Sequence, residues 1–205
     1  MIERQEQKLK QLVGAAVDLF YEKGFQSTRI SDIVGKAGVA QGTFYLYFKS
    51  KEEVFLHICN EFTQLFSALL EETQDLFTGS SHEEVHKNVH RFTHRLITMF
   101  TTNGKMAKIL FFEGGSYGGQ FRKVYEGIYT GFVDIVARRL EKNRQTGYIS
   151  FEDAETEASF LIGMFDRSLF YFMDVKKKVD IDALSRRMAD FIMGGLSKNT
   201  RDIRK

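Results

Sequence analysis

The segment of residues 28–51 constrains the fold of this chain most strongly, because two short helical patterns follow one another across a glycine. The apolar residues of the first pattern recur at helical spacing: Ile30, Ile33, Val34 and Ala37. Thr28 stands just ahead of them, where a hydroxyl can cap the first turn. Gly38 follows them, where a left-handed residue ends a helix at little cost. This layout predicts a helix-turn-helix, a motif with which proteins bind DNA.

The second helical pattern, residues 41–48, turns Phe44 and Phe48 toward the core at a four-residue step. A glycine on the remaining, exposed face costs a helix roughly 1 kcal/mol relative to alanine, whereas close approach to a phosphate backbone favours it. An alternative interpretation is a plain helical corner, in which the two tyrosines only pack against neighbours. We expect this face to contact phosphates and base edges through Gln41, Gly42, Thr43, Tyr45 and Tyr47.

The run AGVAQGTFYLYFKSKEE, residues 37–53, resembles the N-terminal domain of the TetR family of bacterial repressors. Upstream positions also fit that family: Phe20, Gly24, Thr28 and Ile33. The resemblance implies a three-helix DNA-binding domain in which Thr28, Ala40 and Lys51 join the DNA contacts. The chain departs from the family at Ala40 and Gln41, where Ser and Lys are more usual, so this face carries one hydroxyl and one charge fewer.

The whole chain is expected to be all-helical. It has no proline and 17 glycines, and no strand alternation is sustained in its 205 residues. Beyond the helix-turn-helix, the apolar periodicity predicts helices over residues 5–22, 51–77, 82–102, 105–112, 119–143, 152–173 and 180–196. We therefore expect a helix-turn-helix domain over residues 1–50, an effector-binding and dimerisation domain over 51–197, and a flexible tail over 198–205.

The distribution of charge agrees with a DNA-binding N-terminal region. The formal net charge is only +2, but residues 1–51 hold eight Lys or Arg and five Asp or Glu, whereas the remainder holds 21 and 22. The single Cys59 excludes a disulfide framework, and no stretch has the pattern of an export signal or a membrane span. We expect a cytoplasmic protein that does not enter membranes.

One motif suggests different chemistry. His82-Glu83-Glu84-Val85-His86 fits the HExxH pattern of zinc peptidases, and His90 and His94 continue the same step. The same residues also fit a helix start, because Ser81 and Glu84 form a Ser-x-x-Glu capping box. We expect a row of histidines on the flank of a helix, with no catalytic residue, metal or cofactor. A helical zinc-dependent hydrolase that uses His82, Glu83 and His86 remains the alternative function.

The family resemblance implies that the C-terminal region binds a small effector and forms a homodimer through its last two helices. Candidate effector-binding residues, for each of which core packing is the competing explanation, are Phe92, Leu96, Phe100, Phe111, Phe112, Tyr117, Phe121, Tyr125, Tyr129, Phe165 and Arg167. Candidate dimer-interface residues are Leu161, Phe165, Leu169, Phe172, Leu184, Met188 and Phe191. The abundance of aromatic residues favours an apolar or aromatic effector.

Arg167 interrupts an apolar helix and therefore needs a partner. We expect Asp166 or an acidic residue across the dimer, with an effector carboxylate or phosphate as the alternative. Together these observations predict a homodimeric repressor that a small effector releases from operator DNA. A module that has lost DNA recognition and only senses ligand is a third possibility, supported by Ala40 and Gln41 alone.

Overall fold

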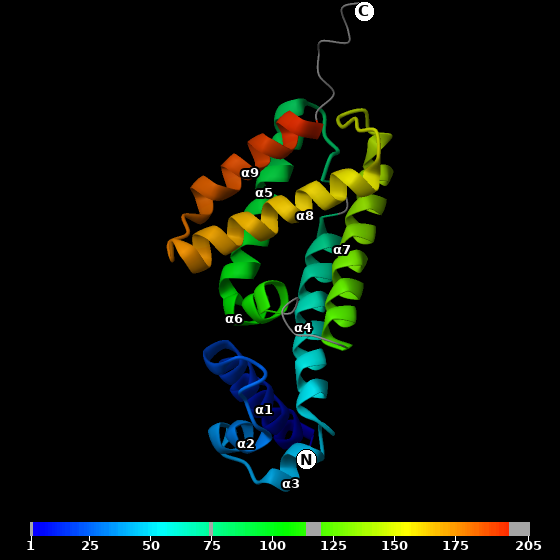
Figure 1. Cartoon of the computed structure of the whole chain (residues 1–205). Helices are drawn as coiled ribbons and strands as arrows, with labels where there is room; N and C mark the ends of the chain where they lie inside the picture. Colours follow the sequence, from blue (N-terminus) through cyan, green and yellow to red (C-terminus); the bar gives the residue numbers. More distant parts are fainter. Residues whose placement is uncertain (1, 74–75, 114–119, 197–205) are drawn as a thin grey trace, which may run out of the picture. The chain divides into compact units, whose positions relative to one another are not determined.

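The computed structural model describes the backbone of residues 2–73, 76–113 and 120–196, and all of their side chains except those of residues 2–4, 112, 113, 120, 121 and 124. The regular elements in this part of the chain are all helical, as predicted (Figure 1). They are α1 (Ile2–Lys23), α2 (Ile30–Ala37), α3 (Gln41–Tyr45), α4 (Lys51–Glu72), α5 (His82–Thr102), α6 (Gly104–Lys108), α7 (Gln120–Arg144), α8 (Ala154–Phe170) and α9 (Ile181–Leu196). Two π-helical turns, η1 (Ile109–Glu113) and η3 (Tyr171–Val175), continue α6 and α8.

The chain divides into two compact units. Unit 1 comprises Met1–Leu65 and Asn103–Arg122, and unit 2 comprises Phe66–Thr102 and Lys123–Lys205. The helix α4 is continuous and contributes residues to both. The expected boundary after residue 50, between a DNA-binding domain and an effector-binding domain, stays a prediction. The expected tail over 198–205 lies outside the described residues.

The core of unit 1 is built from phenylalanine rings. Three rings meet there: Phe20 of α1, Phe25 of the loop that follows α1, and Phe55 of α4. Their centroids lie 5.2 to 6.4 Å apart, and all three are nearly or fully buried. Gly24 ends α1 and Gly38 ends α2, each in a left-handed conformation, with φ of 79° and 67°. Both glycine stops therefore agree with the sequence prediction. These short turns fix the course of the chain into α2 and α3.

In unit 2, α5 and α9 pack side by side along most of their length (Figure 1). The apolar stripe of α5 is buried, from Val85 to Phe100. A polar contact lies within this packing, because the Thr93 hydroxyl donates to the Ser185 carbonyl oxygen at 2.9 Å. The helix α8 begins at Asp153, whose carboxylate accepts a 2.7 Å hydrogen bond from the Thr156 amide. Among the described residues, no helix combines the length and the apolar character needed to cross a membrane.

Candidate nucleic-acid interface

The short helix α3 presents a small exposed surface above one buried ring. Phe44 is fully buried and Phe48 nearly so, which confirms the predicted inward pair. On the other side Gln41 and Gly42 are exposed, and the Tyr45 side chain is 52% exposed. Three further residues are predicted to contact DNA here. Ala40, the N-cap residue of the helix, is exposed, and Thr43 and Tyr47 are half-buried. The helix ends at Tyr45 instead of Phe48, and the chain continues as a turn.

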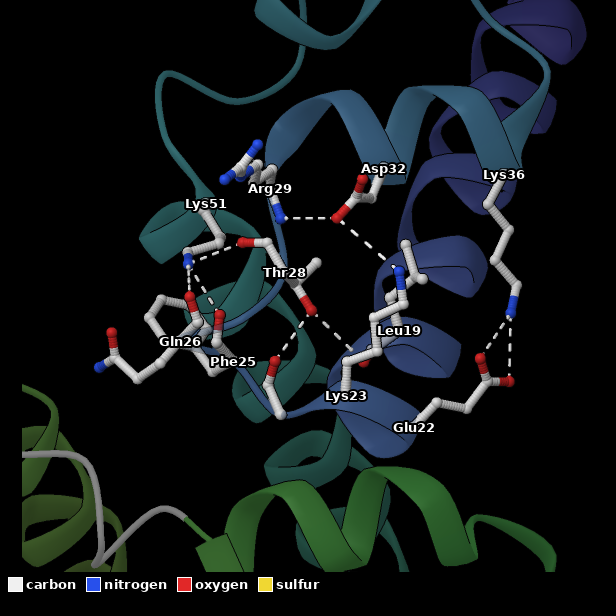
Figure 2. A network of polar contacts seen from close by, with 11 residues as sticks. Leu19, Glu22, Lys23, Phe25, Gln26, Thr28, Arg29, Asp32, Lys36 and Lys51 are labelled. Atoms are coloured by element: carbon white, nitrogen blue, oxygen red, sulfur yellow. Dashed lines mark hydrogen bonds and ion pairs between the residues drawn. The ribbon is translucent and has the colours of Figure 1, made fainter.

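The Thr28 side chain has a structural role in place of the predicted helix cap, and its DNA contact stays a prediction. Thr28 is 1% exposed, and its hydroxyl donates to the carbonyl oxygens of Gly24 at 2.9 Å and Leu19 at 3.3 Å (Figure 2). The N-cap of α2 is Arg29, whose amide donates to the Asp32 carboxylate at 3.1 Å. Thr28 thus ties the end of α1 to the start of α2.

Lys51 is likewise committed within the chain. Its ammonium donates to the carbonyl oxygens of Phe25 at 2.7 Å, Thr28 at 2.8 Å and Gln26 at 3.4 Å, as Figure 2 shows. It also lies 4.3 Å from the centroid of the Phe25 ring. Burial lowers the pKa of Lys51 from its usual value. Because an ammonium has three donors and three carbonyl oxygens accept from it, Lys51 holds the loop before α2, while its contact with DNA stays a prediction.

Tyr47 connects α3 to the first helix. Its hydroxyl donates to the Gln5 carbonyl oxygen at 3.0 Å, so the side chain is fixed while the oxygen can still accept a bond from outside. The ring of Tyr45 packs edge-on against Phe44, with centroids 5.5 Å apart. The exposed face of α3 is therefore held in place from both sides by α1 and by its own buried ring.

These geometric features agree with the comparisons of the chain with known proteins. The sequence profile described as "Bacterial regulatory proteins, tetR family" matches residues 12–58, which include the whole helix-turn-helix. The helix-turn-helix region is therefore that of the TetR family. It is similar to the "Uncharacterized HTH-type transcriptional regulator YdgC" of Bacillus subtilis (strain 168), with 29% identity over 196 residues and 95% of each chain covered.

Solved structures of TetR-like regulators share the fold at lower identity. The regulator FadR of Bacillus subtilis, in complex with stearoyl-CoA, has a TM-score of 0.76 and 22% identity, covering 91% of this chain and 98% of its own. SmeT, of Stenotrophomonas maltophilia, in complex with triclosan has a TM-score of 0.77 and 19% identity, covering 94% and 92%. With a TetR-type helix-turn-helix, the chain is a DNA-binding transcriptional regulator.

Another segment, remote in sequence, packs on α1 of unit 1. In unit 1, Lys105 of α6 pairs with Asp18 of α1 at 2.5 Å, and Lys36 of α2 pairs with the same carboxylate at 3.4 Å. Lys105 and Lys108 also lie 5.8 and 4.9 Å from the centroid of the Tyr21 ring. The hydrogen bond from Lys105, followed by the charges of both lysines, lowers the pKa of Asp18 against the opposing effect of burial.

The predicted effector residues fall into both units. Within unit 2, Phe92, Leu96, Phe100 and Phe165 are buried, Tyr125 and Tyr129 are half-buried, and the Arg167 side chain is 65% exposed. Phe111 is buried in unit 1, against Phe62 at 5.7 Å. Tyr117 and the side chains of Phe112 and Phe121 lie outside the described part. Arg167 pairs with Asp166, which confirms the first of its expected partners.

The predicted dimer residues divide by exposure. Phe165, Leu169 and Met188 are buried within the single chain. Leu161, Phe172 and Leu184 are half-buried, and Phe191 is 69% exposed. Phe160, which the sequence analysis did not select, is 65% exposed on α8. An apolar residue of this size in contact with water indicates a surface that another molecule can cover.

Each residue of the HExxH pattern has another partner. Glu83 pairs with Lys87 at 2.6 Å, and His86 Nε2 lies 2.9 Å from an oxygen of Asp190. The His82 ring packs edge-on against Tyr148, with centroids 5.1 Å apart. Along the described ranges, no three His, Cys, Asp or Glu side chains are arranged to hold a metal ion. The zinc-hydrolase alternative therefore lacks a ligand set in this part of the chain.

Two functional candidates escaped the sequence analysis. Leu46 follows α3 and is 80% exposed beside Tyr45, where an apolar side chain can contact a thymine methyl group. Only its position next to the recognition helix could have indicated this. Asp166 is predicted from the sequence only as a partner for Arg167, yet one of its oxygens is buried and accepts no hydrogen bond from the described residues. No pattern in the sequence reports such an unpaired atom.

Proposed function

We propose that this chain is a homodimeric transcriptional repressor that a small effector, bound in the C-terminal domain, releases from operator DNA. The observation that carries the proposal is the exposed face of α3, anchored by the buried Phe44. Its contacts with phosphates and bases come from Ala40, Gln41, Gly42, Thr43, Tyr45 and Tyr47. Thr28 and Lys51 support this face through the loop that precedes α2.

The effector in this proposal has an apolar or aromatic body. Support comes from related folds, since FadR of Bacillus subtilis binds stearoyl-CoA and SmeT binds triclosan. Both ligands have large apolar parts. Support also comes from unit 2, whose candidate residues are largely aromatic. Residues 51–197 form the effector-binding and dimerisation domain in this scheme.

Release from DNA requires the effector to favour a conformation that binds the operator less well. Two recognition helices must be spaced by roughly 34 to 36 Å to enter successive major grooves. The helix α4 is continuous between residues of unit 1 and unit 2. We infer that a tilt of α4 changes this spacing when effector binds.

The test is fluorescence anisotropy of labelled DNA from the region upstream of the protein's own gene. Tight binding should weaken steeply with salt, because phosphate contacts release counterions. A panel of acyl thioesters, aromatic acids and cationic drugs should contain a class that reverses the binding. Affinity no greater than for random DNA would contradict the proposal.

Matched variants sharpen the assay. Gln41→Ala and Tyr45→Ala should each weaken operator binding by roughly ten-fold or more, as expected for lost base or phosphate contacts. Gln64→Ala removes the same kind of exposed side chain from α4 and should leave affinity unchanged. Equal affinities for all three variants would exclude α3 as the DNA-contacting helix.

A further inference from the structure

Asp166 of α8 carries a buried oxygen to which no described residue donates a hydrogen bond. The residue is 9% exposed, and its Oδ2 accepts two hydrogen bonds from Arg167, from Nε at 2.8 Å and Nη2 at 2.6 Å. Its other oxygen, Oδ1, is buried and accepts none from the described residues. A buried carboxylate oxygen without a donor is costly, so a donor from another molecule has a physical reason to bind there.

Arg167 does not neutralise that oxygen. Both of its bonds go to Oδ2, its side chain is 65% exposed, and its guanidinium lies 5.7 Å from the centroid of the Phe170 ring. The arginine therefore fixes the orientation of the carboxylate from the outside. Because a solvated guanidinium is strongly screened, much of the attraction of Oδ1 for a second cation is retained.

Two tyrosines on α7 lie within reach of the charge of the same carboxylate. Tyr125 and Tyr129 are half-buried one helical turn apart, with ring centroids 6.1 Å apart and planes tilted by 36°. Burial is the main cause that raises the pKa of both hydroxyls, and the negative charge of Asp166 raises it further. The carboxylate is thus close enough to act on both rings. Aromatic faces beside a carboxylate attract a cation and offer nothing to an anion.

We propose that Asp166 Oδ1 and the faces of Tyr125 and Tyr129 bind a protonated amine, and that the effector is an apolar or aromatic molecule carrying that amine. This inference rests on the proposed function, since it names the chemical class of the effector. It differs from the sequence-based alternative, in which Arg167 binds an effector carboxylate or phosphate. In the structure the arginine is already paired, and the unsatisfied group is an acceptor.

Isothermal titration calorimetry with the full chain, without DNA, tests the charge preference. Three probes share one body: 4-phenylbutylamine, 4-phenylbutan-1-ol and 4-phenylbutanoate. The amine should bind roughly ten-fold more tightly than the alcohol, as expected for a charge-assisted hydrogen bond. The carboxylate should bind more weakly than either, because Asp166 repels it. An amine that binds no better than the alcohol, or not at all, would overturn the proposal.

Two substitutions assign the preference to this site. Asp166→Asn keeps the shape and removes the charge, so the amine should lose roughly ten-fold in affinity while the alcohol is unaffected. The retained alcohol binding shows that the variant is folded. Asp134→Asn, an exposed aspartate of α7, is the matched control and should change neither. Equal losses of amine affinity in both aspartate variants would overturn the assignment to Asp166.

A third variant distinguishes a site that binds cations from one that binds anions. Arg167→Gln should retain or increase the affinity for the amine, because it removes a positive charge near Asp166. If 4-phenylbutanoate binds the native chain more tightly than the amine does, and Arg167→Gln loses this binding, the site binds anions and the proposal is overturned. Operator binding is measured separately by anisotropy. A chain that prefers the amine but ignores operator DNA would contradict the repressor function alone, whereas a DNA-binding chain without amine preference would contradict this inference alone.

Discussion

At the scale of single residues, the loop that leads into α2 is held by side chains that a DNA-binding motif would be expected to point outward. Lys51 and Thr28 converge on backbone carbonyl oxygens at the end of α1 and in the following loop. Most of these oxygens lie where the regular hydrogen bonds of α1 end, and a buried hydroxyl and an ammonium supply further hydrogen bonds to them. These two residues therefore contribute to stability directly, and in the proposed function they support DNA binding by fixing the position of α2.

Lys51→Met keeps the aliphatic stem and removes the three donors. We expect the free energy of unfolding to fall by roughly 1 to 3 kcal/mol, because several hydrogen bonds to carbonyl oxygens are lost. Urea unfolding followed by circular dichroism measures this change. Lys49→Met, at an exposed neighbouring lysine, should leave stability unchanged. Unaltered stability of Lys51→Met together with a shallower salt dependence of DNA binding would instead indicate a phosphate contact.

The ion pairs of Asp18 should make the free energy of unfolding depend on pH. Its folded-state pKa is lowered below the usual 3.8, first by the hydrogen bond from Lys105. A lowered pKa means that the unfolded chain binds protons more readily, so the stabilisation is present above the usual pKa and is lost as pH falls through the folded-state value. Asp18→Asn should therefore be less stable than the native chain near neutral pH.

The difference in unfolding free energy between the native chain and Asp18→Asn should shrink as the pH falls below the usual aspartate pKa of 3.8. Urea titrations over this range measure it. Asp134→Asn, which alters an exposed aspartate, controls for the removal of one negative charge. A difference that stays constant with pH would show that the Asp18 carboxylate does not gain from Lys105 and Lys36.

At the scale of elements, the helix limits that local signals mark were predictable from sequence, whereas the ends of α3 and α4 came earlier than predicted. The bounds of α5 match the prediction of residues 82–102, and the Glu84 amide does donate to the Ser81 hydroxyl at 3.2 Å. The Glu84 carboxylate bonds to Ser80 instead, one residue earlier than the capping box requires. Glycine stops and serine caps act within a few residues, and a single sequence contains all of that information.

Contacts that join distant segments were not predictable in the same way. Thr28 fits the pattern of a helix cap, but its hydroxyl is engaged by a carbonyl nine residues away, at Leu19. The α6 segment expected in the C-terminal domain packs on α1 through Lys105. The unpaired Oδ1 of Asp166 depends on burial from several elements. Periodicity places a residue on a face, whereas these partners depend on tertiary packing.

Replacement of Gly42 by alanine should change the stability of helix α3 and the affinity for DNA in opposite directions. A Cβ built at this position meets no atom within 4 Å, so alanine fits the free protein. Gly42→Ala should raise stability by up to about 1 kcal/mol, because alanine is the better helix former. It should also weaken operator binding, since the added methyl group prevents close approach to the phosphate backbone.

Thermal unfolding and anisotropy of the Gly42→Ala variant measure the two effects. Gly14→Ala, at an exposed glycine of α1 with equally open surroundings, should give the gain in stability without the loss of affinity. If Gly42→Ala binds operator DNA as well as the native chain, no phosphate lies close to this position.

At the scale of the whole molecule, the proposed function requires two chains. A single α3 helix offers few base contacts, and helix-turn-helix proteins gain affinity by placing two of them one helical turn apart on DNA. The exposed phenylalanines of α8 and α9, Phe160 and Phe191, are the apolar side chains best placed to be covered by a second copy. Several of the other expected interface residues are already buried within one chain.

The double variant Phe160→Glu/Phe191→Glu should therefore be monomeric at concentrations where the native chain is dimeric. Like charges brought together across a two-fold interface repel, and the apolar area that stabilised the dimer is lost. Sedimentation velocity measures the change in mass. Operator affinity should fall with it, because each half-site is then bound separately.

Leu65→Glu provides the control, because it also replaces an exposed apolar residue, on α4 of unit 1. This variant should keep the mass and the operator affinity of the native chain. A double variant that remains dimeric would move the interface away from the exposed phenylalanines of α8 and α9. A monomeric variant with undiminished operator affinity would mean that one recognition helix suffices, which would contradict the two-helix spacing on which effector release depends.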